Sequence, residues 1–174
     1  EEPPELQHLI DIVRDYNIRQ MEIRIKNEPD SEVYYVGDDN GMQYGLAIGA
    51  AKWRKYLKPA YKAIYDVAHQ AGKMIYMHTD GCIWEIMPDL VECGVDMINP
   101  QFRANGIDNL VRVCRREQII PIHLDLDRQL FPFGSRSRIF DHVGECVESL
   151  WMPEGGLGLN VEFNYEIPLE NMAS

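Results

Sequence analysis

Five short apolar runs, each followed directly by polar residues, constrain the fold of this chain more than any other feature of its sequence. The runs span residues 33–36, 74–77, 95–98, 119–124 and 159–163. Each has the length and the β-branched or aromatic content of a buried strand. Strands that stay apolar without alternation are typical of a parallel sheet covered by helices.

Helical patterns separate these runs. Helices are predicted over residues 5–20, 51–72, 83–93 and 108–116, from Ser135 or Ser137 to about residue 150, and from Pro168 onward. Pro59 is expected to kink or restart its helix, because proline lacks the amide proton and clashes with the preceding turn. Gly72 and Gly94 are expected to end the helices before them. The regular alternation predicts a single α/β domain over residues 1–174.

Two architectures fit this alternation, a (β/α) barrel and an open doubly wound sheet. The chain contains neither GxGxxG nor GxxxxGK[ST], so the nucleotide-binding forms of the open sheet lose their main support. In a barrel, the carboxyl ends of the strands form the active face. The polar residues that end the runs would then face one pocket.

Charge and composition exclude several kinds of partner. The 17 lysines and arginines against 28 acidic residues give a net charge of −11, which disfavours a nucleic-acid partner. Arg112, Arg115 and Arg116 are interpreted as one solvated helix face. No apolar run approaches the roughly 18 residues of a membrane helix, so no membrane partner is expected. The four cysteines form no CxxC pair, which indicates reduced thiols in a cytoplasmic protein.

Every predicted strand ends in residues that can bind a ligand or move a proton. They are Asp38, Asp39 and Asn40, then His78, Thr79 and Asp80, then Asn99 and Gln101, then Asp125 and Asp127, and finally Glu162 and Asn164. We assign catalytic roles to His78, Asp80 and Asp39. We assign substrate binding to Asp38, Asn99, Gln101, Asp125 and Asn164.

Plainer interpretations exist for several of these residues. His78 could be a structural histidine, and Asp38 and Asp39 could form a turn with Gly41. His78, Asp80 and Cys82 alternate in a pattern that could bind zinc, although Cys82 could instead start a helix and pack as a small apolar residue. The remaining histidines are interpreted as structural, surface or boundary residues. They are His123 in a strand and His8, His69 and His142 in helices.

Three segments resemble the uroporphyrinogen decarboxylase superfamily. GDDNGMQYGLAIGAAKWRKYLKPAYKAIYDVAHQAGKMIYMHTDG (37–81) resembles its central portion, and IMPDLVECGVDMINPQ (86–101) resembles the next helix–strand unit. PLENMAS (168–174) is similar to the start of its last helix. The resemblance runs from about residue 5 to the end. It implies a (β/α)8 TIM barrel, which needs about 250 residues. This chain is therefore expected to form a partial barrel of about five parallel strands, the C-terminal portion of such a protein.

The resemblance implies two activities, and the sequence departs from both patterns. Decarboxylases of the superfamily place a histidine after the final strand, where this chain has Phe163 or a neighbour. Its zinc methyltransferases, which exchange methyl groups between corrinoid proteins and thiols, use His-x-Cys where this chain has Asp80. A mixed zinc site could still use His78, either Cys82 or Asp80, and Glu162, with an open fourth position.

The sequence thus favours a metal-assisted, methyltransferase-like function with a small-molecule or corrinoid-protein substrate. The alternatives are a cofactor-free uroporphyrinogen decarboxylase of porphyrin biosynthesis and a catalytically silent partial barrel. A partial barrel exposes two sheet edges and apolar surface. We therefore expect a homodimer or association with a missing N-terminal half, and the isolated chain could be inactive.

Overall fold

A computed structural model of the chain describes residues 3–162 and 167–173. It has one sheet of five strands, all parallel and in the order β1-β2-β3-β4-β5. The strands are β1 (Val33–Gly37), β2 (Met74–His78), β3 (Met97–Asn99), β4 (Ile122–Asp125) and β5 (Leu157–Asn160). The predicted α/β fold with five parallel strands is confirmed.

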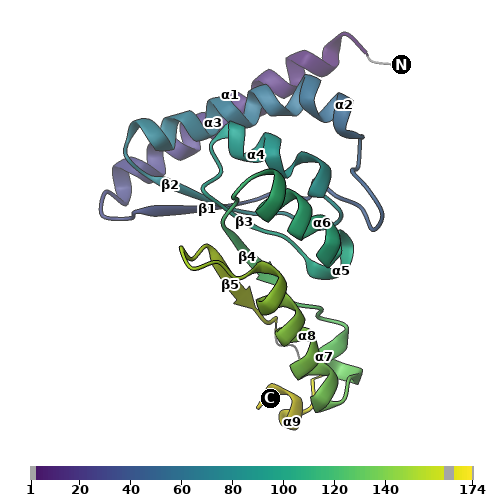
Figure 1. The fold of residues 1–174 in the computed structure, drawn as a ribbon. Coiled ribbons are helices and arrows are strands. Elements are labelled where there is room, and N and C mark those ends of the chain that lie inside the picture. The colour runs from purple at the N-terminus through teal and green to yellow at the C-terminus, as the bar shows by residue number, and fades with distance from the viewer. Residues whose placement is uncertain (1–2, 163–166, 174) are drawn as a thin grey trace.

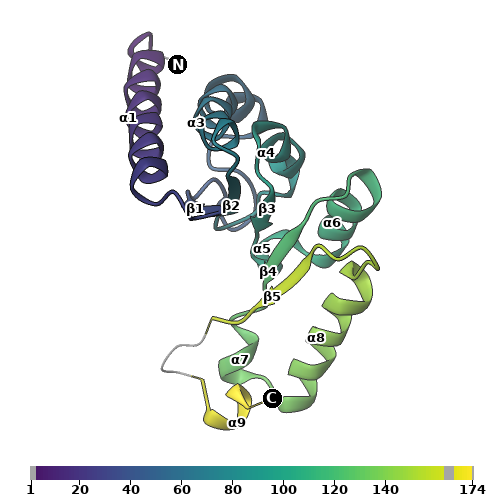
Figure 2. The same cartoon turned by 90° about the vertical axis from the view of Figure 1, so that its left-hand side faces the viewer.

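Helices connect the strands and cover one side of the sheet. They are α1 (Glu5–Asn27), α2 (Ala50–Lys52), η1 (Trp53–Leu57), α3 (Lys58–Gln70), η2 (Trp84–Ile86), α4 (Met87–Cys93), α5 (Phe102–Asn105), α6 (Ile107–Val111), η3 (Arg112–Glu117), α7 (Leu130–Phe133), α8 (Arg136–Leu150) and α9 (Leu169–Met172). Figure 1 shows α1 beside α3 at one end of the molecule and α7, α8 and α9 at the other. In Figure 2, α1, α3, α4, α6 and α8 follow one another along the outer side of the curved sheet. No described helix is long and apolar enough to cross a membrane.

The two faces of the sheet differ because successive side chains of a strand point to opposite faces. One face packs under the helices, and its side chains are almost fully buried. They include Tyr34, Ile75, Met77, Ile98, Ile122 and Leu124. The other face is open in the described chain, where Val33 is 47% exposed, Tyr35 55% and Met74 46%. The sheet is therefore covered on one face rather than on both.

Strand and helix limits shift where backbone chemistry intervenes. The first helix continues to Asn27, beyond the predicted residue 20. β3 begins at Met97 rather than at residue 95, because the Val95 amide bonds back to Leu90 in the turn that ends α4. β4 begins at Ile122, after Pro121, which has no amide proton to donate to a neighbouring strand. β5 begins at Leu157 rather than at residue 159, because Leu157 pairs with Ile122.

The long helix before β2 changes its hydrogen bonding near Pro59 and does not stop there. A π-helical turn, η1, lies between α2 and α3 without a break, and Pro59 lies in the first turn of α3. Gly72 (φ +73°) and Gly94 (φ +107°) follow α3 and α4 with the positive φ angles that favour glycine.

Arg115 corrects the interpretation of the basic cluster as a solvated face. Its guanidinium donates hydrogen bonds to the backbone oxygens of Leu150 (2.6 Å), Cys114 (2.7 Å), Ile120 (2.7 Å) and Gly156 (3.2 Å). Burial lowers the pKa of Arg115 from its ordinary value. The side chain therefore ties the end of α8 to the segments that lead into β4 and β5.

His142 is likewise not a surface residue. It is 8% exposed, its ring packs edge-on against Phe102, and its Nε2 accepts the amide proton of Asp127 at 3.0 Å. An acceptor nitrogen carries no proton, so the native ring is neutral. Burial lowers the pKa of His142 below its ordinary value.

This buried imidazole predicts a pH-dependent stability. Because the folded pKa lies below the unfolded value of about 6.5, the unfolded chain binds more protons, and stability is lost as pH falls below about 6.5. The loss from this one residue is at most about 1.4 kcal/mol per pH unit. Urea unfolding at pH 7.5 and pH 5.5 measures it. His142→Gln keeps an acceptor but cannot titrate, so an equally steep decline in this variant would contradict the assignment.

Candidate active site at the carboxyl ends of the strands

A cavity of about 390 Å³ lies at the carboxyl ends of the strands, on the open face of the sheet. Its lining consists of Tyr35, Tyr76, His78, Asp80, Asn99, His123, Asp125, Arg128, Asn160 and Glu162. Five of these residues were predicted from the sequence, and they come from four different strand ends. They are His78, Asp80, Asn99, Asp125 and Glu162.

The ring of His78, the last residue of β2, is oriented by the neighbouring strands. Its Nδ1 lies 2.8 Å from the Oδ1 atom of Asn99. The Asn99 amide nitrogen donates to Asp125 Oδ1 at 2.8 Å and to the backbone oxygen of His123, so the Asn99 oxygen must face His78. Nδ1 of His78 therefore donates the proton in this bond. The arrangement fixes which ring nitrogen remains for chemistry.

That remaining nitrogen, Nε2, faces a carboxylate. It lies 3.3 Å from Asp80 Oδ1. The Asp80 carboxylate also accepts a hydrogen bond from Gln101 Nε2, and Gln101 Oε1 accepts the amide proton of Gly81 at 3.0 Å. Gln101 thus holds Asp80 from the next strand end. A histidine between an amide and a carboxylate can give up or take up a proton at Nε2.

Two glycines let the loop after β2 approach the loop after β1. A Cβ at Gly81 would lie 2.3 Å from the backbone carbon of Gly41, and Gly81 has a φ of +82°. The Cys82 amide donates to the Met42 backbone oxygen at 2.8 Å. The buried side chain of Asn105 donates to the Gly81 backbone oxygen at 3.1 Å. This close contact sets the position of Asp80.

Sequence reasoning missed Tyr35, Tyr76, His123, Arg128 and Asn160. Tyr76 Oη bonds His123 Nδ1 at 2.8 Å, and Asn160 donates to Asp125 Oδ1 at 2.7 Å. The rings of Tyr35 and Tyr76 stack with centroids 5.6 Å apart, and burial raises the pKa of Tyr76 to about 12. A period of two could have found two of them, because Tyr76 precedes His78, and His123 precedes Asp125, by two residues.

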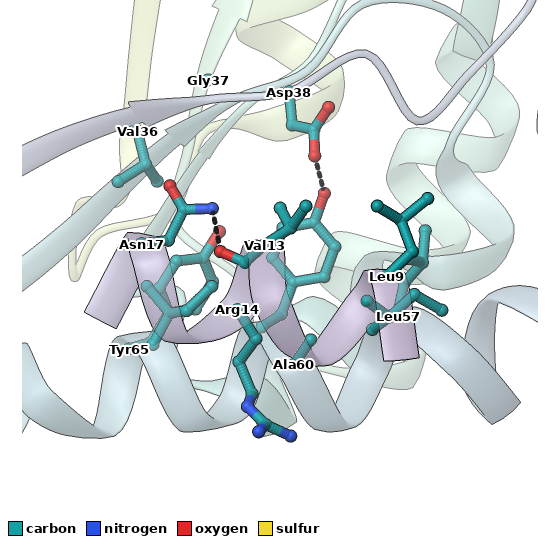
Figure 3. A pocket seen from close by; sticks show the side chains of 13 residues that line it. Leu9, Val13, Arg14, Asn17, Val36, Gly37, Asp38, Leu57, Ala60 and Tyr65 are labelled. Atoms are coloured by element: carbon teal, nitrogen blue, oxygen red, sulfur yellow. Dashed lines mark hydrogen bonds between the residues drawn. The ribbon is translucent and has the colours of Figure 1, made fainter. Parts of the chain in front are cut away.

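The predicted residues after β1 do not line this cavity. Asp38 accepts a hydrogen bond from the Tyr61 hydroxyl of α3 and lines a separate apolar cavity of about 310 Å³ between α1 and α3 (Figure 3). Asp39 is exposed. Asn40 is buried and accepts the indole proton of Trp53 at 2.6 Å, so it anchors the helix layer. Gln101 does not line the cavity either, and its side chain donates a hydrogen bond to the Asp80 carboxylate. Asn164 lies outside the described residues.

The predicted zinc ligands do not form a cluster. Cys82 is only 9% exposed, and burial raises the pKa of its thiol, which disfavours the thiolate that zinc requires. Glu162 instead pairs with Arg128 at 3.3 Å. Within residues 3–162 and 167–173, no three histidine, cysteine or acidic side chains lie close enough to hold a metal ion.

A sequence profile of the family described as uroporphyrinogen decarboxylase (URO-D) matches residues 1–174. The chain belongs to the uroporphyrinogen decarboxylase family. The resemblance in the central HTDG, PDL and NPQ motifs is thereby confirmed at the level of the URO-D family. No curated protein matches the chain.

Two solved structures are similar to this URO-D family chain at low sequence identity. A fungal β-1,4-galactanase aligns with a TM-score of 0.52 and 15% identity over 91% of this chain and 59% of its own. A type I 3-dehydroquinate dehydratase from Clostridium difficile, covalently modified with comenic acid, aligns with a TM-score of 0.48 and 9% identity over 87% of this chain and 53% of its own. The chain thus spans somewhat more than half the length of both structures. The galactanase likeness supports the barrel-type fold.

Proposed function

We propose that this chain supplies the proton-transferring part of a URO-D family active site that removes carboxyl groups from a small molecule. The proposal rests on one observation, the orientation of His78, whose Nε2 faces the cavity beside Asp80 while Asn99 holds Nδ1. A decarboxylase of this kind needs a proton donor at the reacting carbon and no metal. The side chain of His78 meets the first requirement.

The proposed step conserves atoms and charge. The carbon–carbon bond to the carboxylate breaks, carbon dioxide leaves, and the electron pair stays on the substrate carbon. A proton moves from Nε2 of His78 to that carbon, and water returns a proton to the ring. Asp80 Oδ1 lies 3.3 Å from Nε2, and Asn99 keeps the ring from turning.

Methyl transfer through a corrinoid protein stays a prediction from the sequence. Its zinc-dependent form needs a thiolate or an equivalent third ligand beside His78, and the described side chains do not supply that set. We therefore place proton transfer first.

We further propose that the site is completed by additional polypeptide, either a second copy or further β–α units. β1 and β5 are the edges of the sheet, and Val33, Tyr35 and Met74 are exposed on its open face. Apolar inner faces of this kind are filled in closed barrels. This chain would then supply His78 to a cavity that it shares with the additional polypeptide.

Product analysis tests the reaction in the protein's native assembly. A porphyrinogen carrying acetate and propionate groups should lose carboxyl groups, detected by mass spectrometry, in buffer containing a metal chelator. Methylation of a thiol by a methylcorrinoid protein, dependent on bound zinc, would replace this proposal with methyl transfer. If neither product forms in the complete assembly, the chain is a silent barrel segment.

A further inference from the structure

Arg128 is the one lysine or arginine among the described residues that line the strand-end cavity. It follows β4, and its Nη1 lies 3.3 Å from Glu162 Oε2. Both side chains are more than half exposed, at 54% and 58%. An exposed ion pair with one long contact contributes little to stability, so it can be exchanged at little cost.

Arg103 provides a comparison, because its guanidinium is held firmly by a carboxylate. It makes two hydrogen bonds to Asp127, at 2.8 and 2.6 Å, and the Asp127 side chain is only 13% exposed. Such a two-point pair is geometrically specific and strong. Arg103 does not line the strand-end cavity. Arg103 follows β3 and Arg128 follows the neighbouring strand β4, and the two arginines therefore differ in how firmly they are held.

The charges of the side chains that line the cavity indicate a binding role for Arg128. Asp80 and Asp125 line the cavity and repel an anion, so a carboxylate ligand needs a cation at the rim. A guanidinium matches a carboxylate with two parallel hydrogen bonds. The stacked rings of Tyr35 and Tyr76 line the same cavity and offer a surface against which a ring can pack.

We propose that Arg128 is a substrate-binding residue that leaves Glu162 and pairs with a carboxylate of a ring-bearing ligand. Glu162 holds the arginine at the rim in the free protein and competes with the ligand for it. The inference rests on the proposed function for the kind of ligand, and it names a residue and an exchange that the proton-transfer step does not require.

Binding of benzoate and its neutral counterpart benzamide tests the exchange in the protein's native assembly, by titration calorimetry at low ionic strength. Benzoate should bind more tightly than benzamide. Arg128→Gln should lower benzoate affinity about tenfold and leave benzamide binding unchanged, because the charge-assisted bonds are lost. Glu162→Gln should raise benzoate affinity about threefold, because the competing carboxylate is gone.

Arg103→Gln is the matched control, and it should change neither affinity. The proposal is overturned if Arg128→Gln and Arg103→Gln weaken benzoate equally, or if Glu162→Gln fails to strengthen it. Carbon dioxide release by the wild-type protein separates this inference from the proposed reaction. If the Arg128 and Glu162 effects on binding appear while the wild-type protein releases no carbon dioxide, the exchange stands and the decarboxylation fails.

Discussion

Replacing His78 by asparagine is expected to lower the rate of carboxyl loss by about 10²- to 10⁴-fold, the usual contribution of a general acid or base. The His78 ring is the group whose Nε2 faces both the cavity and Asp80. Asparagine can still bond the Asn99 side chain but cannot deliver a proton at that position. Single-turnover kinetics, with thermal unfolding as a check on folding, measure the loss.

His123→Asn provides the matched comparison. His123 lines the same cavity, but its Nδ1 is engaged by the Tyr76 hydroxyl at 2.8 Å. We expect less than a tenfold change in rate, since His123 is not the proton donor in the proposed step. Equal losses in the two variants would show that the cavity needs histidine rings for shape, and would remove His78 from its proposed role.

Gly81→Ala is expected to destabilise the chain by about 3–5 kcal/mol, in the range of the most damaging single substitutions. The new Cβ would lie 2.3 Å from the Gly41 carbon and 2.4 Å from its oxygen, and both are backbone atoms that cannot swing aside. The positive φ of +82° adds strain for any residue with a side chain. Chemical denaturation measures the change in the free energy of unfolding.

Gly72→Ala separates backbone strain from the steric overlap. Gly72 also has a positive φ, +73°, but an added Cβ there meets nothing within 4 Å. Its substitution should cost only about 1 kcal/mol. If Gly81→Ala cost no more than Gly72→Ala, the close approach of the two loops would not be what fixes the HTDG segment.

The sequence is most informative where a property is local. Apolar runs of strand length, an irregular turn in the helix near Pro59 and the helix ends at Gly72 and Gly94 depend on nearby residues and on backbone geometry, and all appear in the structure. Strand limits moved where a partner strand or a proline decided them, as at Ile122. The short helix α7 was not predicted at all, because its four residues carry too little periodic signal.

The sequence does not predict the direction in which each side chain points. His78, Asp80, Asn99 and Asp125 share one cavity because parallel strands in register carry their carboxyl ends to one edge, which the strand order implies. Asp38 follows the carboxyl end of β1, yet its carboxylate accepts a hydrogen bond from Tyr61 of α3 and does not line this cavity. Arginine and histidine are residue types expected at the surface. Hydrogen bonds to backbone groups distant in the sequence instead hold Arg115 and His142 in the interior, to the Leu150 oxygen and the Asp127 amide respectively.

The sequence by itself determined the order of the elements, the parallel sheet and the family, because these follow from short-range patterns and from the spacing of motifs along the chain. Only the tertiary structure decided which ring nitrogen of His78 is left for chemistry and that Glu162 faces an arginine rather than joining a metal-ligand set. The physical reason is that hydrogen bonds and ion pairs of buried and half-buried groups depend on which residues meet across strands and loops, and that is set by packing.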